Sequence, residues 1–132
     1  MSHLFQCRVY YEDTDLAGIV YYANYFKFIE RARSEWVREL GIDQGKLKAE
    51  RDVVFAVRRV EGDYLKPAVF DDILEVETKV IAIRPARLEL SQIVRRDGID
   101  LFVSKVTLVA LTGAGAPTRL PQELRQKLAG NS

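Results

Sequence analysis

The sequence predicts an α+β domain in which a five-stranded antiparallel sheet wraps around one long helix. Three observations lead to this prediction. A stretch with helical periodicity covers residues 23–40. Segments that alternate like strands precede it once and follow it four times. The connections between the later strands are short, which favours antiparallel pairing.

The first half of the chain leads into the predicted helix. Residues 4–11 alternate between apolar and polar side chains and are expected to form a half-buried strand. A loop over residues 12–19 joins this strand to the helix, whose apolar side chains recur at steps of three and four residues. Gly41 is placed to end the helix, and residues 43–51 are expected to form a short polar helix or a loop.

The second half has the pattern of strands. They are predicted at residues 53–66, 73–83, 87–95 and 99–111. The first of them is expected to bend at Gly62, and the Asp97-Gly98 pair indicates a tight hairpin between the last two. A Gly-Ala-Gly-Ala-Pro turn then precedes a terminal helix over residues 121–128.

Leftover apolar side chains on the predicted sheet indicate subunit pairing. By strand alternation, Ile81 and Ile83 fall on the face opposite Val76 and Val80. A sheet of this kind also has open edges, which can pair with another chain. We therefore expect a homo-oligomer.

Size and composition bound the class of protein. The 132 residues suit a single domain over residues 1–132, with one hydrophobic core. A formal net charge of +1 without a Lys/Arg cluster gives no indication of nucleic-acid binding. No apolar stretch approaches the roughly 20 residues of a membrane span, and the N-terminus lacks a signal-peptide pattern. We expect no membrane insertion and a cytoplasmic location.

The few metal-ligating side chains exclude two kinds of site. The single cysteine, Cys7, rules out an internal disulfide and a multi-cysteine zinc site. The single histidine, His3, is expected to be solvated in a frayed terminus. Neither a metal nor a cofactor is expected.

The stretch between the first strand and the helix is the candidate active site. Residues 11–25 hold an Asp-Thr-Asp turn, one glycine and four tyrosines. This concentration of carboxylates and aromatic side chains is poor core material. The start of a helix offers free backbone N–H groups, and a loop beside it can aim a carboxylate at them.

The residues of this stretch have a recognisable order. The pattern is Tyr11-x-x-Thr14-Asp15-x-x-Gly18-x-Val20-Tyr21-Tyr22-x-x-Tyr25, followed by Phe28-x-Glu30-x-Ala32-Arg33. With this pattern, and with Arg119-Leu120-Pro121 before the last helix, the chain resembles hotdog-fold acyl-CoA thioesterases of the 4-hydroxybenzoyl-CoA thioesterase type. Within that family it resembles the Tol-Pal-associated YbgC-like enzymes. The resemblance implies a hotdog fold and hydrolysis of short-chain or aromatic acyl-CoA.

The resemblance also implies roles for two catalytic residues. Asp15 corresponds to the family's catalytic carboxylate, acting as nucleophile or as general base on water. Tyr22 stands where YbgC-like enzymes usually have histidine and the hydroxybenzoyl-CoA enzymes have tyrosine. A phenol with a reference pKa of about 10 can donate a hydrogen bond but is a poor base at neutral pH. The backbone N–H at or near Tyr22 would polarise the thioester carbonyl.

Further residues are expected to bind the substrate or shape the loop. The residues expected to bind the substrate are Gly18, Ile19, Val20, Tyr25, Arg59 and Arg119. Of these, the two arginines are expected to bind the phosphates of coenzyme A. Coenzyme A belongs to the substrate, so no separate cofactor is implied. Asp13 is expected to be solvated or to form a hydrogen bond within the loop, and Thr14 to fix the loop.

The resemblance further implies a dimer or tetramer with the site at the dimer interface, where the helix start of one subunit faces strands of the other. Two alternatives to an acyl-CoA thioesterase stay open. One is a thioesterase for acyl carrier protein, which favours a basic docking patch. The other is a non-catalytic acyl-CoA-binding protein. The absence of the family histidine favours this alternative, and the presence of Asp15 argues against it. A hotdog dehydratase would need a histidine in the motif, and His3 lies outside it.

Overall fold

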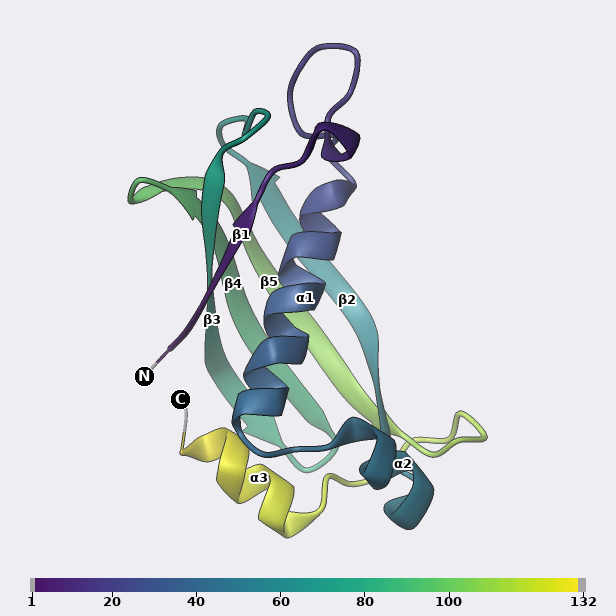
Figure 1. The fold of residues 1–132 in the computed structure, drawn as a ribbon. Coiled ribbons are helices and arrows are strands. Elements are labelled where there is room, and N and C mark those ends of the chain that lie inside the picture. The colour runs from purple at the N-terminus through teal and green to yellow at the C-terminus, as the bar shows by residue number, and fades with distance from the viewer. Residues whose placement is uncertain (1, 131–132) are drawn as a thin grey trace.

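The computed structural model describes residues 2–130, which form an antiparallel sheet and three α-helices (Figure 1). The strands are β1 (His3–Arg8), β2 (Val54–Tyr64), β3 (Ile73–Arg84), β4 (Arg87–Arg96) and β5 (Ile99–Leu111). The helices are α1 (Asn24–Glu39), α2 (Gln44–Arg51) and α3 (Gln122–Ala129), and a short 3-10 helix, Tyr11–Asp13, follows β1. The sheet order is β1-β3-β4-β5-β2, with every neighbouring pair antiparallel. The prediction of a five-stranded antiparallel sheet is confirmed.

The helix α1 lies across one face of the twisted sheet and contacts β1, β3 and β4 (Figure 1). It has 16 residues, and α2 and α3 have 8 each. The side chains that α1 buries against the sheet are Tyr25, Phe28, Ile29, Ala32, Trp36 and Val37. Burying a large apolar side chain contributes roughly 1.5–3 kcal/mol, so this stripe holds α1 in place.

One buried amide ties α1 to the sheet. Gln92 on β4 donates from Nε2 to the Ile29 carbonyl and to Thr78 Oγ1, both at 2.9 Å. Its Oε1 accepts a hydrogen bond of 2.8 Å from Arg33 Nη1. Desolvation at this position lowers the pKa of the Arg33 guanidinium. Because the amide of Gln92 is fully hydrogen-bonded, its burial leaves no unsatisfied polar group.

A register shift in β3 decides which isoleucine faces the core. The pairing with β4 shifts between Val80 and Ala82, which leaves Ile81 as an extra residue. The alternation of side chains therefore reverses after this point. Ile83 packs against the core, whereas Ile81 is 51% exposed. The expectation that Ile83 shares the outer face with Ile81 is wrong.

The β4–β5 hairpin matches its prediction, whereas β2 differs from it. Asp97 and Gly98 both have positive φ, 51° and 78°, as a type I′ turn requires. In β2 the register shift falls between Val57 and Arg59 and not at Gly62, where a bend was expected.

Gly62 makes room for an aromatic ring. It keeps a regular pairing with Ser104. A Cβ atom at this position would lie 2.6 Å from the ring of Phe102. The glycine therefore lets Phe102 pack directly on the backbone of β2.

His3 was expected in a solvated, frayed terminus, and this expectation is wrong. The strand β1 begins at His3, which pairs with Thr78 of β3. The His3 side chain is 10% exposed, and its Nε2 lies 2.8 Å from Glu39 Oε2 at the end of α1. Strand pairing and this contact order the segment.

Replacing Gly62 by alanine is expected to destabilise the protein. The added methyl group must displace the Phe102 ring, and overpacking of this kind costs about 1–3 kcal/mol. Urea unfolding of Gly62→Ala measures the loss in the free energy of unfolding. Gly130→Ala is the control, since that position has φ −65° and only ordinary contacts of 3.6 Å or more. Equal stability of both variants and the wild type would contradict the packing argument.

Candidate active site

Asp13 holds the acidic loop ahead of α1. Its carboxylate Oδ2 accepts a hydrogen bond of 2.8 Å from the Tyr10 N–H. Its backbone carbonyl accepts from the Tyr21 N–H and from Asn24 Nδ2, both at 2.9 Å. Asp13 is 9% exposed, so the expectation of a solvated side chain is wrong and the alternative of a loop hydrogen bond is confirmed. The loop is thereby closed from the end of β1 to the first residue of α1.

The segment after β2 forms the second support of the loop. The Val20 N–H donates to the Ala68 carbonyl at 2.9 Å, and the Ala68 N–H donates to Tyr25 Oη at 3.0 Å. Ile19 forms an isolated antiparallel bridge with Val69. The segment around Ala68 therefore contacts both the loop and the start of α1.

Asp15 lies in the turn that these contacts hold, and its side chain is exposed in the single chain. Its N–H donates to the Ile19 carbonyl at 2.9 Å, and its carbonyl accepts from the Gly18 N–H at 3.0 Å. Gly18 has φ +82°, a left-handed conformation that glycine adopts without strain. The carboxylate Oδ1 accepts from the Ala17 N–H at 2.9 Å. Within residues 2–130, Oδ2 has no hydrogen-bond partner and is open to a ligand.

The start of α1 offers backbone donors. Ala23 occupies the N-cap position without a capping side chain. The N–H groups of Asn24 and Tyr25 donate to the carbonyls of Tyr21 and Tyr22 at 2.8 and 3.4 Å. In the described part of the chain, the N–H groups of Tyr22 and Ala23 have no acceptor. Free donors at the positive end of a helix dipole are suited to a developing oxyanion.

A cavity of about 280 Å³ lies beside these donors. Its lining residues are Ile19, Val20, Tyr22, Tyr25, Tyr64, Leu65, Lys66 and Pro67. The first four of these belong to the predicted site. Tyr64 and residues 65–67 do not, because the sequence pattern does not show that the end of β2 lies beside the start of α1.

Aromatic rings form much of the cavity wall. The Tyr64 ring lies 4.7 Å from that of Phe102, 5.5 Å from Tyr25 and 6.2 Å from Tyr22, measured between centroids. Burial raises the pKa values of Tyr25 and Tyr64. A hydrogen bond with Tyr22 raises the pKa of Tyr21, and the charge of Asp15 adds to this shift. Because their pKa values are raised, the phenols of Tyr21, Tyr25 and Tyr64 stay protonated at neutral pH and can donate hydrogen bonds.

The two predicted phosphate-binding arginines lie away from this cavity within one protomer. Arg59 on β2 is exposed, and its Nε lies 3.0 Å from Glu61 Oε1. Arg119 is exposed and precedes α3, which lies beside the other end of α1 (Figure 1). Neither residue lines the cavity.

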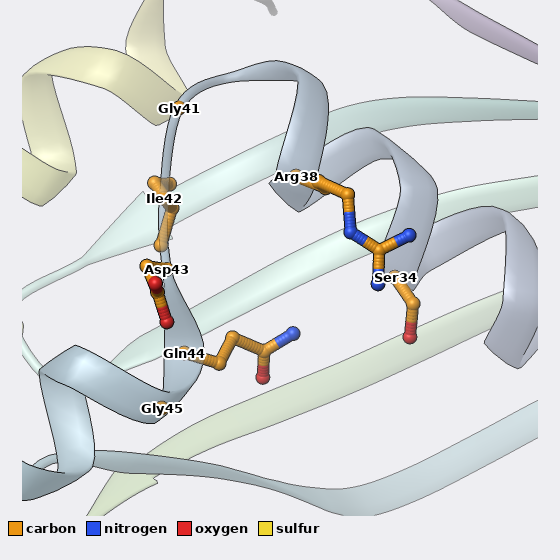
Figure 2. Close-up of a pocket in the computed structure, with 7 residues that line it drawn as sticks. All are labelled: Ser34, Arg38, Gly41, Ile42, Asp43, Gln44 and Gly45. Carbon is orange, nitrogen blue, oxygen red and sulfur yellow. The ribbon is translucent and has the colours of Figure 1, made fainter.

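A different cavity, of about 490 Å³, lies at the C-terminal end of α1 (Figure 2). Its lining residues are Ser34, Arg38, Gly41, Ile42, Asp43, Gln44 and Gly45. Arg38 pairs with Glu35, and Asp43 Oδ1 caps α2 by accepting from the Lys46 N–H at 3.0 Å. The end of α1 carries partial negative charge, and at the start of α2 the carboxylate of Asp43 already caps the helix, so neither lining element favours an oxyanion. The cavity at the start of α1 is therefore the better candidate.

Two other classes of feature are absent from residues 2–130. No three His, Cys, Asp or Glu side chains there are arranged to hold a metal ion. None of the helices in that range is both long and apolar enough to cross a membrane.

Comparison with known proteins identifies the family. The family model of the Thioesterase superfamily matches residues 17–103. The chain belongs to the thioesterase superfamily. Among curated relatives, it is 40% identical over 124 residues to the acyl-CoA thioesterase YbgC of Haemophilus influenzae, covering 92% of this chain and 90% of that protein. It is 43% identical over 105 residues to the acyl-CoA thioester hydrolase YbgC of Escherichia coli O6:H1, covering 79% and 78%.

Solved structures of thioesterases have the same fold. A probable thioesterase from Bartonella henselae superposes with a TM-score of 0.88 at 35% identity, covering 92% of this chain and all (100%) of the other. A 4-hydroxybenzoyl-CoA thioesterase superposes with a TM-score of 0.91 at 20% identity over 96% and 98% of the two chains, which shows the fold alone. The hotdog architecture and the prediction of a thioester hydrolase are confirmed for this superfamily member.

Removing the Asp13 carboxylate is expected to loosen the loop. Asp13→Ala leaves the Tyr10 N–H without its acceptor, and an unsatisfied group of this kind costs about 1–3 kcal/mol. Glu12→Ala is the control, because this exposed neighbour should change stability by less than about 0.5 kcal/mol. Denaturant unfolding compares the two variants. An Asp13→Ala protein as stable as Glu12→Ala would refute the assigned role.

Proposed function

We propose that this thioesterase hydrolyses acyl-CoA thioesters with short or aromatic acyl groups, releasing the free acid and coenzyme A. The central observation is the combination of an open carboxylate oxygen on Asp15 with the free N–H groups of Tyr22 and Ala23. Thioester hydrolysis needs a nucleophile or base together with donors for the carbonyl oxygen. The names of the YbgC relatives support coenzyme A as the thiol part of the substrate.

The proposed chemistry begins with the carbonyl oxygen bound by the free N–H groups at the start of α1. Asp15 then acts in one of two ways. It attacks the carbonyl carbon and forms an acyl-enzyme anhydride that water hydrolyses, or it removes a proton from a water molecule that attacks directly. In both routes the C–S bond breaks and the sulfur leaves as the thiolate of coenzyme A, which then takes up a proton. The phenol of Tyr22 serves as a hydrogen-bond donor and not as the base.

The cavity supports the proposed acyl groups. A volume of about 280 Å³ accommodates an aryl ring or a short aliphatic chain. Tyr22, Tyr25 and Tyr64 offer ring faces and edges to an aromatic acyl group. Ile19 and Val20 offer aliphatic surface to a short chain, and Gly18 shapes the turn that carries them.

The surface around the site supports a homo-oligomer. Large apolar side chains exposed on the loop, the 3-10 helix and the segment after β2 are Tyr11, Leu16, Leu65, Val69 and Phe70. Strand β2 also has a free edge, because β5 is its only neighbour in the described sheet. Apolar patches and free edges of this kind mark protein interfaces. We therefore propose that the site lies at a dimer interface. Arg59 and Arg119 of one subunit would then reach the phosphates of a coenzyme A thioester that is bound at the site of the other subunit.

Asp15→Asn is expected to lower turnover by several orders of magnitude while acyl-CoA still binds. The asparagine keeps an oxygen for the Ala17 N–H, so the turn is preserved, but it removes the negative charge. Thiol release is followed with a thiol-reactive dye across short-chain, aromatic and long-chain acyl-CoAs. Cys7 contributes little background, because burial raises its thiol pKa to about 11.

Glu12→Gln is the control for Asp15→Asn, since it changes an exposed carboxylate in the same loop. A wild-type protein that binds acyl-CoA and releases no thiol would favour the non-catalytic binder. Release from acyl carrier protein thioesters alone would favour that second enzymatic alternative.

The wild-type protein is expected to be a dimer or tetramer in solution. Pairing removes the exposed apolar side chains around the site from water, which favours association. Light scattering at micromolar concentration measures the mass, and thiol release is assayed at the same concentrations. An active monomer would contradict the interfacial site.

A further inference from the structure

Tyr22 lies between two peptide planes that carry the free donors of the site. The first plane contains its own N–H and the Tyr21 carbonyl, which accepts from the Asn24 N–H at 2.8 Å. The second contains its carbonyl and the Ala23 N–H. The Tyr22 carbonyl accepts from the Tyr25 N–H at 3.4 Å, which is long for a hydrogen bond, and from Tyr64 Oη at 3.0 Å.

We infer that Tyr64 is a positioning residue for thioester hydrolysis, because its hydroxyl orients the second of these peptide planes. This inference rests on the proposed function of the site. A peptide unit is rigid and planar, so a hydrogen bond that fixes its carbonyl also fixes the direction of its N–H. A carbonyl that accepts a hydrogen bond polarises its amide, which strengthens the N–H as a donor.

The helix start has no side-chain cap for its N–H groups, so the Tyr64 contact to the Tyr22 carbonyl is its side-chain link to the sheet within the described residues. The N-cap residue Ala23 has no polar side chain, and no capping hydrogen bond is made there. Asn24 Nδ2 bonds to the loop, at the Asp13 carbonyl, and not to the helix. Tyr64 thus links the start of α1 to β2, and therefore to the sheet.

The Tyr64 ring is itself held in place. It packs on Phe102 at 4.7 Å and on Tyr25 at 5.5 Å between centroids. Phe102 occupies the space that Gly62 leaves open, and Tyr25 Oη accepts from the Ala68 N–H. A supporting side chain that is locked by packing can hold a catalytic donor in its productive orientation.

The Tyr64 hydroxyl is available as a donor across the neutral range. A bond to a carbonyl requires the protonated phenol. Burial, with a smaller contribution from the neighbouring phenols of Tyr22 and Tyr25, raises the pKa of Tyr64 above its ordinary value. The contact is therefore present under the conditions of the assay.

Tyr64→Phe tests the inference, because it removes only the hydroxyl and keeps the ring. Direct loss of an oxyanion donor costs about 10²–10³ in rate, and loss of its support should cost less, about tenfold in kcat, with KM little changed. Tyr10→Phe is the matched control, since Tyr10 is 60% exposed and does not line the cavity. Steady-state thiol release with the best acyl-CoA measures both constants for the three proteins.

An infrared measurement separates positioning from a general loosening of the cavity. The probe is a ketone analogue of the best substrate, with a methylene group in place of the thioester sulfur and a ¹³C-labelled carbonyl. Donors at the start of α1 lower the stretching frequency of the bound carbonyl, and this shift should shrink in Tyr64→Phe but persist in Tyr10→Phe.

A lower kcat together with a smaller carbonyl shift supports the inference. An unchanged kcat, or a lower kcat with an unchanged carbonyl shift, overturns it. If the wild type hydrolyses no thioester, the proposed function fails. The orienting contact of Tyr64 is then tested with the ketone analogue of an acyl-CoA that binds, and equal carbonyl shifts in wild type and Tyr64→Phe overturn it.

Discussion

The hydrogen bonds at Ala68 join the acidic loop, the start of α1 and the segment after β2, the last of which lies far from the other two in the sequence. Ala68 is fully buried, so its N–H and carbonyl both need partners within the protein. The carbonyl takes the N–H of Val20 in the loop, and the N–H takes the hydroxyl of Tyr25 on α1. The segment after β2, the acidic loop and the helix start are therefore held in one arrangement. The open carboxylate of Asp15 and the free donors of α1 depend on it for their relative position.

The motif that identifies the family mixes residues of different physical roles. Phe28 and Ala32 are buried between α1 and the sheet, where the size and shape of the side chain matter. Arg33 donates a hydrogen bond to Gln92, whose buried amide connects the helix to the sheet. Asp15 and Tyr22, by contrast, are exposed in the single chain and have unused hydrogen-bonding groups. A fixed pattern of residues can therefore reflect packing at one position and chemistry a few residues away.

Periodicity and turn chemistry were enough to predict the strands, the helices and the Asp97-Gly98 hairpin, and the family resemblance added half of the residues that line the cavity. These features are local, so a short window of sequence contains their cause. Tyr64 could not be predicted, because its place beside Tyr22 follows from the position of β2 next to β5 at the edge of the sheet. The burial of Asp13 and the ordering of His3 also depend on partners far along the chain or on the closed shape of the loop. Long-range pairing leaves little trace in the residues themselves.

The extra residue Ile81 in β3 decides which face of the sheet each later side chain of the strand occupies. Beyond it, each side chain lies on the face opposite to the one that simple alternation assigns. Deleting this single residue would remove the bulge, so that Ala82 would follow Val80 directly and Ile83 would stay on the core side opposite Leu88. Among relatives, a chain without this residue should therefore alternate without interruption through β3, with the following side chains on the same faces as here. Homologues that differ in length here are best aligned by the face that each side chain occupies rather than by residue identity.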